Sequence, residues 1–121
     1  MTRAMSGLVA ACVVALPVAL APTAYAGFGD THVYGTGLDE TVDCNDSTLF
    51  VDGTNNTVTA VGSCYAVTMQ GSSNTVVADN VQNDITVYGW HQTVLYKNGD
   101  PVVTDIGRQR GMTNRIDRIP A

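Results

Sequence analysis

Gly53-Thr54-Asn55-Asn56-Thr57-Val58 is a six-residue phrase that the chain repeats at a fixed spacing. It returns as Gly71-Ser72-Ser73-Asn74-Thr75-Val76 and, in altered form, as Gly89-Trp90-His91-Gln92-Thr93-Val94, so the step is 18 residues each time. Gly35 and Gly107 lie one further step away on either side. A constant period of this length is typical of solenoids, in which each repeat packs against its neighbours. The repeat therefore predicts the architecture of most of the chain.

Apolar residues alternate with other residues on both sides of the repeated glycine, and the same positions recur one period later, which indicates strands with one buried face. Before the glycine these positions hold Leu49, Val67, Ile85 and Val103, then Val51, Met69, Val87 and Asp105; after it they hold Val58, Val76, Val94 and Met112. The pattern predicts an all-β, single-domain parallel β-helix, or β-solenoid, of about four coils. Its handedness stays open: parallel crossovers are usually right-handed, but 18 residues also divide into three six-residue faces that suit a left-handed triangular helix.

The repeated phrase itself is predicted to form the corner between two strands. Glycine adopts the positive φ that a sharp turn requires, and asparagine tolerates it better than most residues. We therefore predict structural turn residues at Gly53, Asn56, Gly71, Asn74, Gly89, Gln92 and Gly107. Asn56 and Asn74 are expected to hydrogen-bond in a ladder along the stack, which Gln92 continues imperfectly. Thr57, Thr75 and Thr93 are expected to form a second ladder beside it.

Four segments follow from this interpretation. Residues 1–26 are predicted to be a signal peptide, residues 27–41 an N-terminal lead-in and cap, residues 42–116 the solenoid, and residues 117–121 a C-terminal tail. The departure from the period at Gly111-Met112-Thr113-Asn114, four residues late, indicates an insertion near Arg108 to Arg110.

The signal-peptide prediction rests on a basic start at Arg3, an apolar run and the small-residue end Ala24-Tyr25-Ala26. A transmembrane anchor is the first alternative, disfavoured because Pro17 interrupts a run shorter than the roughly 20 residues that span a bilayer. A lipoprotein acylated at Cys12 is the second, disfavoured because apolar residues continue well past it. The sequence therefore predicts a secreted protein, or one on the exterior of the cell envelope, without a transmembrane anchor after cleavage.

Charge and cysteine content narrow the classes of partner. Removal of residues 1–26 leaves 95 residues with 11 acidic and 5 basic side chains, a net charge of −6. Such an acidic body argues against nucleic acid as a partner. Cys44 and Cys64 remain as an even pair suited to a disulfide in an oxidising compartment. A metal site is the alternative, disfavoured because the two histidines do not stand at zinc-ligand spacing, and we expect neither metal nor cofactor.

The third repeat departs most, because Trp90 and His91 replace small residues at a corner that should face water. Together with predicted outward residues nearby they suggest a contiguous apolar patch, a feature that marks contact surfaces. The candidate interaction patch comprises Val77, Tyr88, Trp90, His91, Leu95 and Ile106. The alternative is that Trp90 folds over the wall as a local cover.

These repeats resemble a family of small secreted actinobacterial proteins catalogued as domain of unknown function 3060. The resemblance rests on Cys44, the phrases at Gly53 and Gly71, Gly62-Ser63-Cys64, Asn98-Gly99-Asp100-Pro101 and Asp105-Ile106-Gly107, and covers roughly residues 42–116. It implies export, a stack of the parallel β-helix kind and a pairing of Cys44 with Cys64. It implies no activity and no catalytic residue.

The sequence contains no glycine-rich phosphate loop and no nucleophile elbow, so we expect no enzymatic activity. The leading hypothesis is an exported, non-enzymatic structural or interaction protein whose partner is an unknown protein or envelope component, with self-association as one form of contact. The alternative is a carbohydrate-binding module on the solenoid surface that uses Tyr88, Trp90, Asp79 and Asp84. Calcium bound by acidic turns is disfavoured, because the glycine-aspartate nonapeptide of calcium solenoids is absent.

Overall fold

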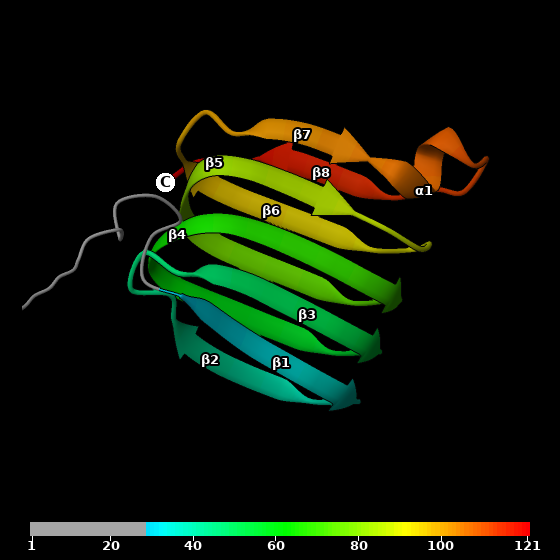
Figure 1. Ribbon diagram of the computed structural model, residues 1–121, viewed down its shortest axis with the longest axis horizontal. Coiled ribbons are helices and arrows are strands. Elements are labelled where there is room, and N and C mark those ends of the chain that lie inside the picture. Colours follow the sequence, from blue (N-terminus) through cyan, green and yellow to red (C-terminus); the bar gives the residue numbers. More distant parts are fainter. Residues whose placement is uncertain (1–28) are drawn as a thin grey trace, which may run out of the picture.

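The computed structural model describes residues 29–121, and the predicted signal peptide lies outside them. The described chain forms a parallel β-solenoid of about five turns (Figure 1). Its strands are β1 (Asp30–Thr36), β2 (Asp39–Asp43), β3 (Thr48–Thr54), β4 (Thr57–Ser72), β5 (Thr75–Val87), β6 (Thr93–Asn98), β7 (Val102–Asp105) and β8 (Arg115–Arg118), with one short helix, α1 (Ile106–Gln109). The all-β solenoid predicted from the period is confirmed.

The coils are flattened, so the solenoid has two walls joined by two corners. The front wall in Figure 1 consists of β1, β3, the ends of β4 and β5, and β7; the rear wall consists of β2, the starts of β4 and β5, β6 and β8. We call the edge that carries Gly53, Gly71 and Gly89 the glycine corner, and the opposite edge the cysteine corner. Front-wall strands run toward the glycine corner and the chain returns behind them as it climbs, so the coil is right-handed, as expected for parallel crossovers.

Pairing between coils follows the 18-residue step predicted from the sequence. Gly35 is paired with Gly53, and Gly53 with Gly71. The pairing begins at Asp30 and reaches Arg118, so the stack extends beyond the predicted limits of 42 and 116 at both ends. β1 and the first part of β2 lie in the segment 27–41 that was expected to be a lead-in and cap. The two strands form a complete first coil, and for this reason the solenoid has about five turns rather than four.

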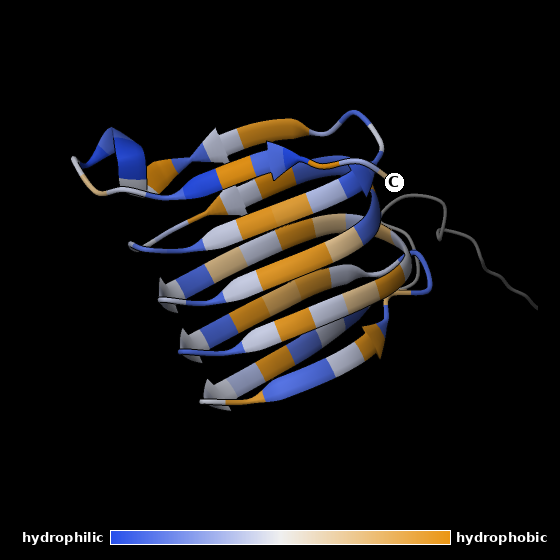
Figure 2. Ribbon diagram, turned by 180° about the vertical axis from the view of Figure 1, so that it is seen from behind, coloured by the Kyte–Doolittle hydropathy of each residue, from blue (hydrophilic) through white to orange (hydrophobic). Residues whose placement is uncertain are grey.

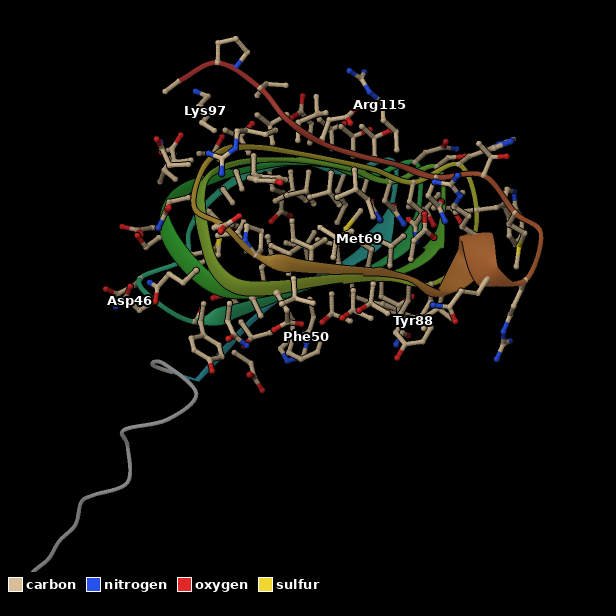
Figure 3. The ribbon with its side chains drawn as sticks, turned by 90° about the horizontal axis from the view of Figure 1, so that it is seen from above. Asp46, Phe50, Met69, Tyr88, Lys97 and Arg115 are labelled. Carbon is tan, nitrogen blue, oxygen red and sulfur yellow. A yellow bond between two sulfur atoms is a disulfide. The ribbon has the colours of Figure 1, made fainter. Side chains whose placement is uncertain are left out.

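The core is a set of apolar columns that run along the solenoid axis. Figure 2 shows the alternation of apolar and polar residues along each strand. Looking down the axis, Figure 3 shows Met69 inside the coil and Phe50 and Tyr88 outside it. The inward residues Leu49, Val67 and Ile85 are paired in one such column and are fully buried. Each buried side chain of this size contributes about 1.5–3 kcal/mol to stability, so the columns are the main source of it.

A polar ladder runs through the interior at the glycine corner. Asn56, Asn74 and Gln92 are 0%, 0% and 1% exposed. The side-chain amide of Asn56 donates to the Gly35 carbonyl (2.9 Å), and that of Asn74 donates to the Gly53 carbonyl (3.0 Å). A buried polar group is costly without a partner, so each amide is tolerated because the neighbouring coil satisfies it.

The links between successive rungs are of two kinds. The main-chain N–H of Asn56 donates to the side-chain oxygen of Asn74 (3.1 Å), whereas the side-chain amide of Asn74 donates to that of Gln92 (2.8 Å). The ladder therefore differs from the simple side-chain stack expected, and the longer Gln92 accounts for the change at its rung. In the threonine column the bonds run through the main chain: the N–H of Thr75 donates to the Asn56 carbonyl (2.8 Å).

Backbone geometry explains the glycines of this corner. Gly53 has a φ of 122°, and a Cβ there would collide with the Gly35 carbonyl. Two residues later the chain again turns left-handed, at Asn55, Ser73 and His91, with φ of 58°, 58° and 55°. Histidine and asparagine are among the residues enriched at positive φ, so His91 fits its place in the turn.

The last coil contains the insertion expected near Arg108 to Arg110. Thr75 is paired with Thr93 at a step of 18, whereas Thr93 is paired with Arg115 at a step of 22. The extra residues form α1 and the turn after it. Asn114 nevertheless takes the next rung of the ladder, since its side chain accepts from the Gln92 N–H (2.8 Å) and donates to the Gly89 carbonyl (3.0 Å).

A disulfide closes the cysteine corner. Cys44 and Cys64 are bonded, with 4.9 Å between their Cα atoms, and both are buried. The bond ties the first coil to the second, where the N–H of Cys44 also donates to the Val61 carbonyl (3.1 Å). The predicted pairing of these two cysteines is therefore present in the structure.

Replacing Asn74 with alanine should lower the free energy of unfolding by about 3 kcal/mol, because it leaves several buried donors and acceptors without partners. Chemical denaturation of wild type and variant measures the difference. Asn83→Ala is the matched control. Asn83 is exposed, and within residues 29–121 its side-chain amide bonds only the side chain of the neighbouring Asp84. A loss of stability no greater than that of the control would contradict the role given to the ladder.

Replacing both cysteines with alanine should lower the free energy of unfolding by about 3 kcal/mol, the cost expected for a loop of this size. Cys44 and Cys64 are 20 residues apart. Denaturation of the double variant, compared with the oxidised and the reduced wild type, measures the effect. The reduced wild type should unfold close to the double variant; equal stability of the oxidised and reduced forms would refute the prediction.

Candidate binding surfaces

The six residues of the candidate patch do not form one surface. Val77 and Leu95 are paired neighbours on the rear wall and are half-buried. Tyr88 follows β5 on the front wall, where it is 41% exposed and points outward (Figure 3). Ile106 begins α1 one period later. The sequence interpretation was wrong in joining them, because outward residues before and after a corner face opposite directions.

Trp90 and His91 lie at the glycine corner between these two groups. Trp90 is 48% exposed, and its main chain forms a bridge with Ser72. Its carbonyl accepts from the Ser73 N–H (3.2 Å). The Trp90 side chain is therefore about half exposed and is not fully covered by the wall.

A groove that the sequence analysis missed lies on the outer face of the front wall, across the first three coils. It has a volume of about 270 Å³. On one side stand His32, Phe50 and Thr68, and on the other Tyr34, Asp52 and Gln70, each set aligned by strand pairing. Val33 and Val51 also line it, and because their side chains are buried inside, the main chain forms the floor.

Aromatic stacking gives this groove a defined side. The rings of His32 and Phe50 are stacked, with centroids 4.9 Å apart and planes inclined by 10°. Strand pairing in register places the two rings on neighbouring coils, so the distance between their centroids is close to the spacing of neighbouring strands. Across the groove Tyr34 is 77% exposed. The stack fixes each ring against the other, and the groove also contains a carboxylate, an amide and a hydroxyl group from Asp52, Gln70 and Thr68.

The groove left a weak signal in the sequence. His32 and Phe50 are one period apart, as are Tyr34 and Asp52, so the 18-residue step alone predicts that they are neighbours. Because the sequence predicts a cap over residues 27–41, the predicted columns do not include His32 and Tyr34.

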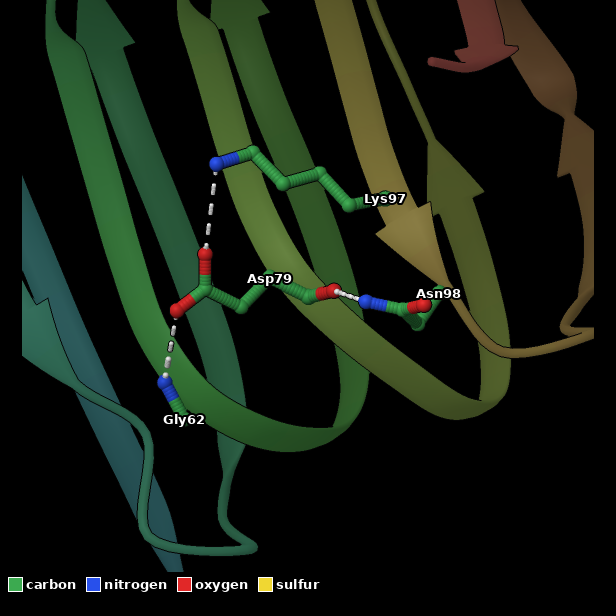
Figure 4. A network of polar contacts seen from close by, with 4 residues as sticks. All are labelled: Gly62, Asp79, Lys97 and Asn98. Atoms are coloured by element: carbon green, nitrogen blue, oxygen red, sulfur yellow. Dashed lines mark hydrogen bonds and ion pairs between the residues drawn. The ribbon is translucent and has the colours of Figure 1, made fainter. Parts of the chain in front are cut away.

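The carboxylates considered for carbohydrate binding are engaged at the cysteine corner. Asp79 accepts from the Gly62 N–H (3.2 Å), and its other oxygen is 3.7 Å from the Lys97 ammonium (Figure 4). The Asp79 carbonyl accepts from the Asn98 amide (3.1 Å). Tyr88 and Trp90 belong to the opposite corner, so these aspartates and aromatics do not share a site.

Two further observations concern the described part of the chain. Among residues 29–121, no group of three or more histidine, cysteine, aspartate or glutamate side chains is placed to hold a metal ion. Within the same range, no helix has the length and apolar character needed to span a membrane.

A comparison with protein families gives a match over residues 51–109 to the family described as "Protein of unknown function (DUF3060)". This stretch of the chain therefore matches the DUF3060 family model. The family assignment agrees with the resemblance seen in the glycine and asparagine repeats. The DUF3060 stretch starts within β3 and ends with α1, so it contains three rungs of the amide ladder and part of the groove. Neither the curated proteins nor the solved structures give a match.

Proposed function

We propose that this DUF3060 protein is an exported, non-enzymatic interaction module that acts outside the cell or on the exterior of its envelope. Export is supported by the layout of residues 1–26 and by a buried disulfide, a bond that persists in oxidising compartments. The solenoid supplies a rigid wall on which side chains are held at fixed spacing. The groove on the front wall is the contact surface that we assign to it.

The exposed aromatic groups of the groove carry this proposal. Tyr34 and the His32–Phe50 stack point away from the core, so they are not needed to fill it. Aromatic side chains are enriched at contact surfaces because they offer a large area with few rotatable bonds. The polar groups buried at the glycine corner, by contrast, are bonded to neighbouring coils and are not available to a partner.

Carbohydrate binding in the same groove is the second candidate. Small-ligand sites combine apolar walls with a few polar groups that fix orientation. The groove has this composition, since Asp52, Thr68 and Gln70 stand beside the rings of His32 and Phe50. This candidate differs from the carbohydrate site expected from the sequence, which used the separated residues Tyr88, Trp90, Asp79 and Asp84.

Replacing Tyr34 and Phe50 together with serine should reduce retention on isolated cell envelopes at least tenfold, because it removes the apolar part of the contact. A pull-down with envelopes from the producing cells measures retention. Trp90→Ser with Leu95→Ser is the matched control, an equal number of apolar-to-serine changes outside the groove. Thermal unfolding of both variants checks that each remains folded.

The preparation of the envelopes separates the two candidates. Retention that survives protease treatment of the envelopes and is lost with purified cell-wall polysaccharide as competitor supports carbohydrate binding. Retention that protease abolishes supports a protein partner. Equal retention of the groove variant, the control variant and wild type would remove the groove from the proposal.

A further inference from the structure

Among residues 29–121, the strands at the two ends of the solenoid are paired on one side only. At the N-terminal end β1 pairs with β3 and β2 with β4; at the C-terminal end β7 pairs with β5 and β8 with β6. Each end therefore presents two parallel edges with free hydrogen-bonding groups, a template for a further coil. At the C-terminal end Val102 and Val103 are 69% and 44% exposed, although Val103 belongs to a column buried in the inner coils.

Charge is distributed unequally between these ends. From Gly29 to Tyr96 the chain contains no lysine or arginine. The first coil and the turn after it hold five acidic residues: Asp30, Asp39, Glu40, Asp43 and Asp46. The last coil holds four arginines, Arg108, Arg110, Arg115 and Arg118, against two aspartates, Asp105 and Asp117, and Arg115 is paired with Asp117 (2.7 Å). The solenoid therefore has an acidic N-terminal end and an end where its arginines gather.

One charged residue at each end stands in an inward column. Glu40 pairs with Val58, which is fully buried, so Glu40 occupies the inward position of the first coil. Arg118 pairs with Tyr96, which packs against the core, and its guanidinium lies 5.4 Å from the Tyr96 ring centroid. The two inward charges have opposite signs.

We propose that the C-terminal end of one copy binds the N-terminal end of a second copy, head to tail, so that the solenoid continues across the junction. In the same register, β8 would pair with β2 of the next copy and β7 with β1. Arg115 would then stand opposite Asp39 of the next copy, and Arg118 would lie diagonal to its Glu40. Val103 would lie against Thr31 of the next copy, within a continued column.

Charge selects this arrangement over its alternatives. Two N-terminal ends would bring like charges together, and so would two C-terminal arginine clusters, which is unfavourable at close range. An inward charge also opposes pairing with any apolar edge, because it would be buried without a partner. An opposite charge in the facing coil removes that penalty, so Glu40 and Arg118 confer specificity for the head-to-tail contact.

The contact is heterologous and does not close on itself, so it leads to open chains of copies rather than to a fixed dimer. Its attraction comes from charges near solvent, which salt screens over about 8 Å at physiological ionic strength. We therefore expect association that grows with protein concentration and weakens as salt is added. This inference concerns the ends of the stack and does not depend on the groove.

Sedimentation velocity of the folded protein, over a concentration series at 20 mM and at 500 mM sodium chloride, tests the proposal. At low salt the weight-average mass should rise with concentration to at least twice that of the monomer, and at high salt it should return toward the monomer. A monomer at every concentration in low salt would overturn the proposal. So would association that strengthens with salt, since that points to an apolar contact instead.

Charge-reversal variants test whether Glu40 and Arg118 form the contact between copies. Glu40→Arg and Arg118→Glu, each alone, should return the low-salt mass to that of the monomer, because each places like charges at the junction. The double variant with both changes should associate again, since every junction regains an opposite pair. Both sites are exposed in the single copy, and thermal unfolding checks that the variants fold. Association of the single variants equal to wild type, or failure of the folded double variant to associate, would refute the assigned pairing.

Discussion

Satisfaction of the buried amides at the glycine corner is the constraint on which the register of the solenoid depends. Apolar columns alone do not fix it, because a slip of two residues keeps every apolar side chain facing inward. Such a slip would remove the partners of Asn56 and Asn74 inside the coil. Each orphaned group costs about 1–3 kcal/mol, so the ladder separates the native register from alternatives that the hydrophobic effect treats as equal.

The same ladder explains why the sequence predicted the coils well. A position that only glycine can occupy, followed three residues later by a buried amide, leaves a strong signal at Gly53, Gly71 and Gly89. The first coil was assigned to the cap and lacks this signal, because Leu38 takes the position that asparagine holds in the next coil. Its N–H still donates to the Asn56 side chain (3.0 Å), but no amide marks the corner. A column can therefore continue in space after its residue identity has changed.

Residues on the outer walls were harder to predict, for a related reason. Inward positions must fit the coil above and below, so their chemistry repeats. Outward positions are under no such restriction: His32, Phe50 and Thr68 share a column and little else. A search for repeated residues therefore could not find the groove. The patch around Trp90 was wrongly joined, because residues that are close in sequence at a corner can lie on different walls. In this solenoid the inward positions repeat from coil to coil, whereas the outward positions vary.

The four extra residues of the last coil show how much freedom the corner allows. The chain forms α1, which contains Gly107, and then returns to place Asn114 on the ladder above Gln92. Stacking at this corner therefore does not require a fixed number of residues per coil. It requires only that an amide side chain lies at the next rung of the ladder. The corner acts as a docking point that tolerates detours, which makes it the natural position for lengthening this chain. New sequence inserted there could give a variant an additional surface feature while both walls retain their alignment.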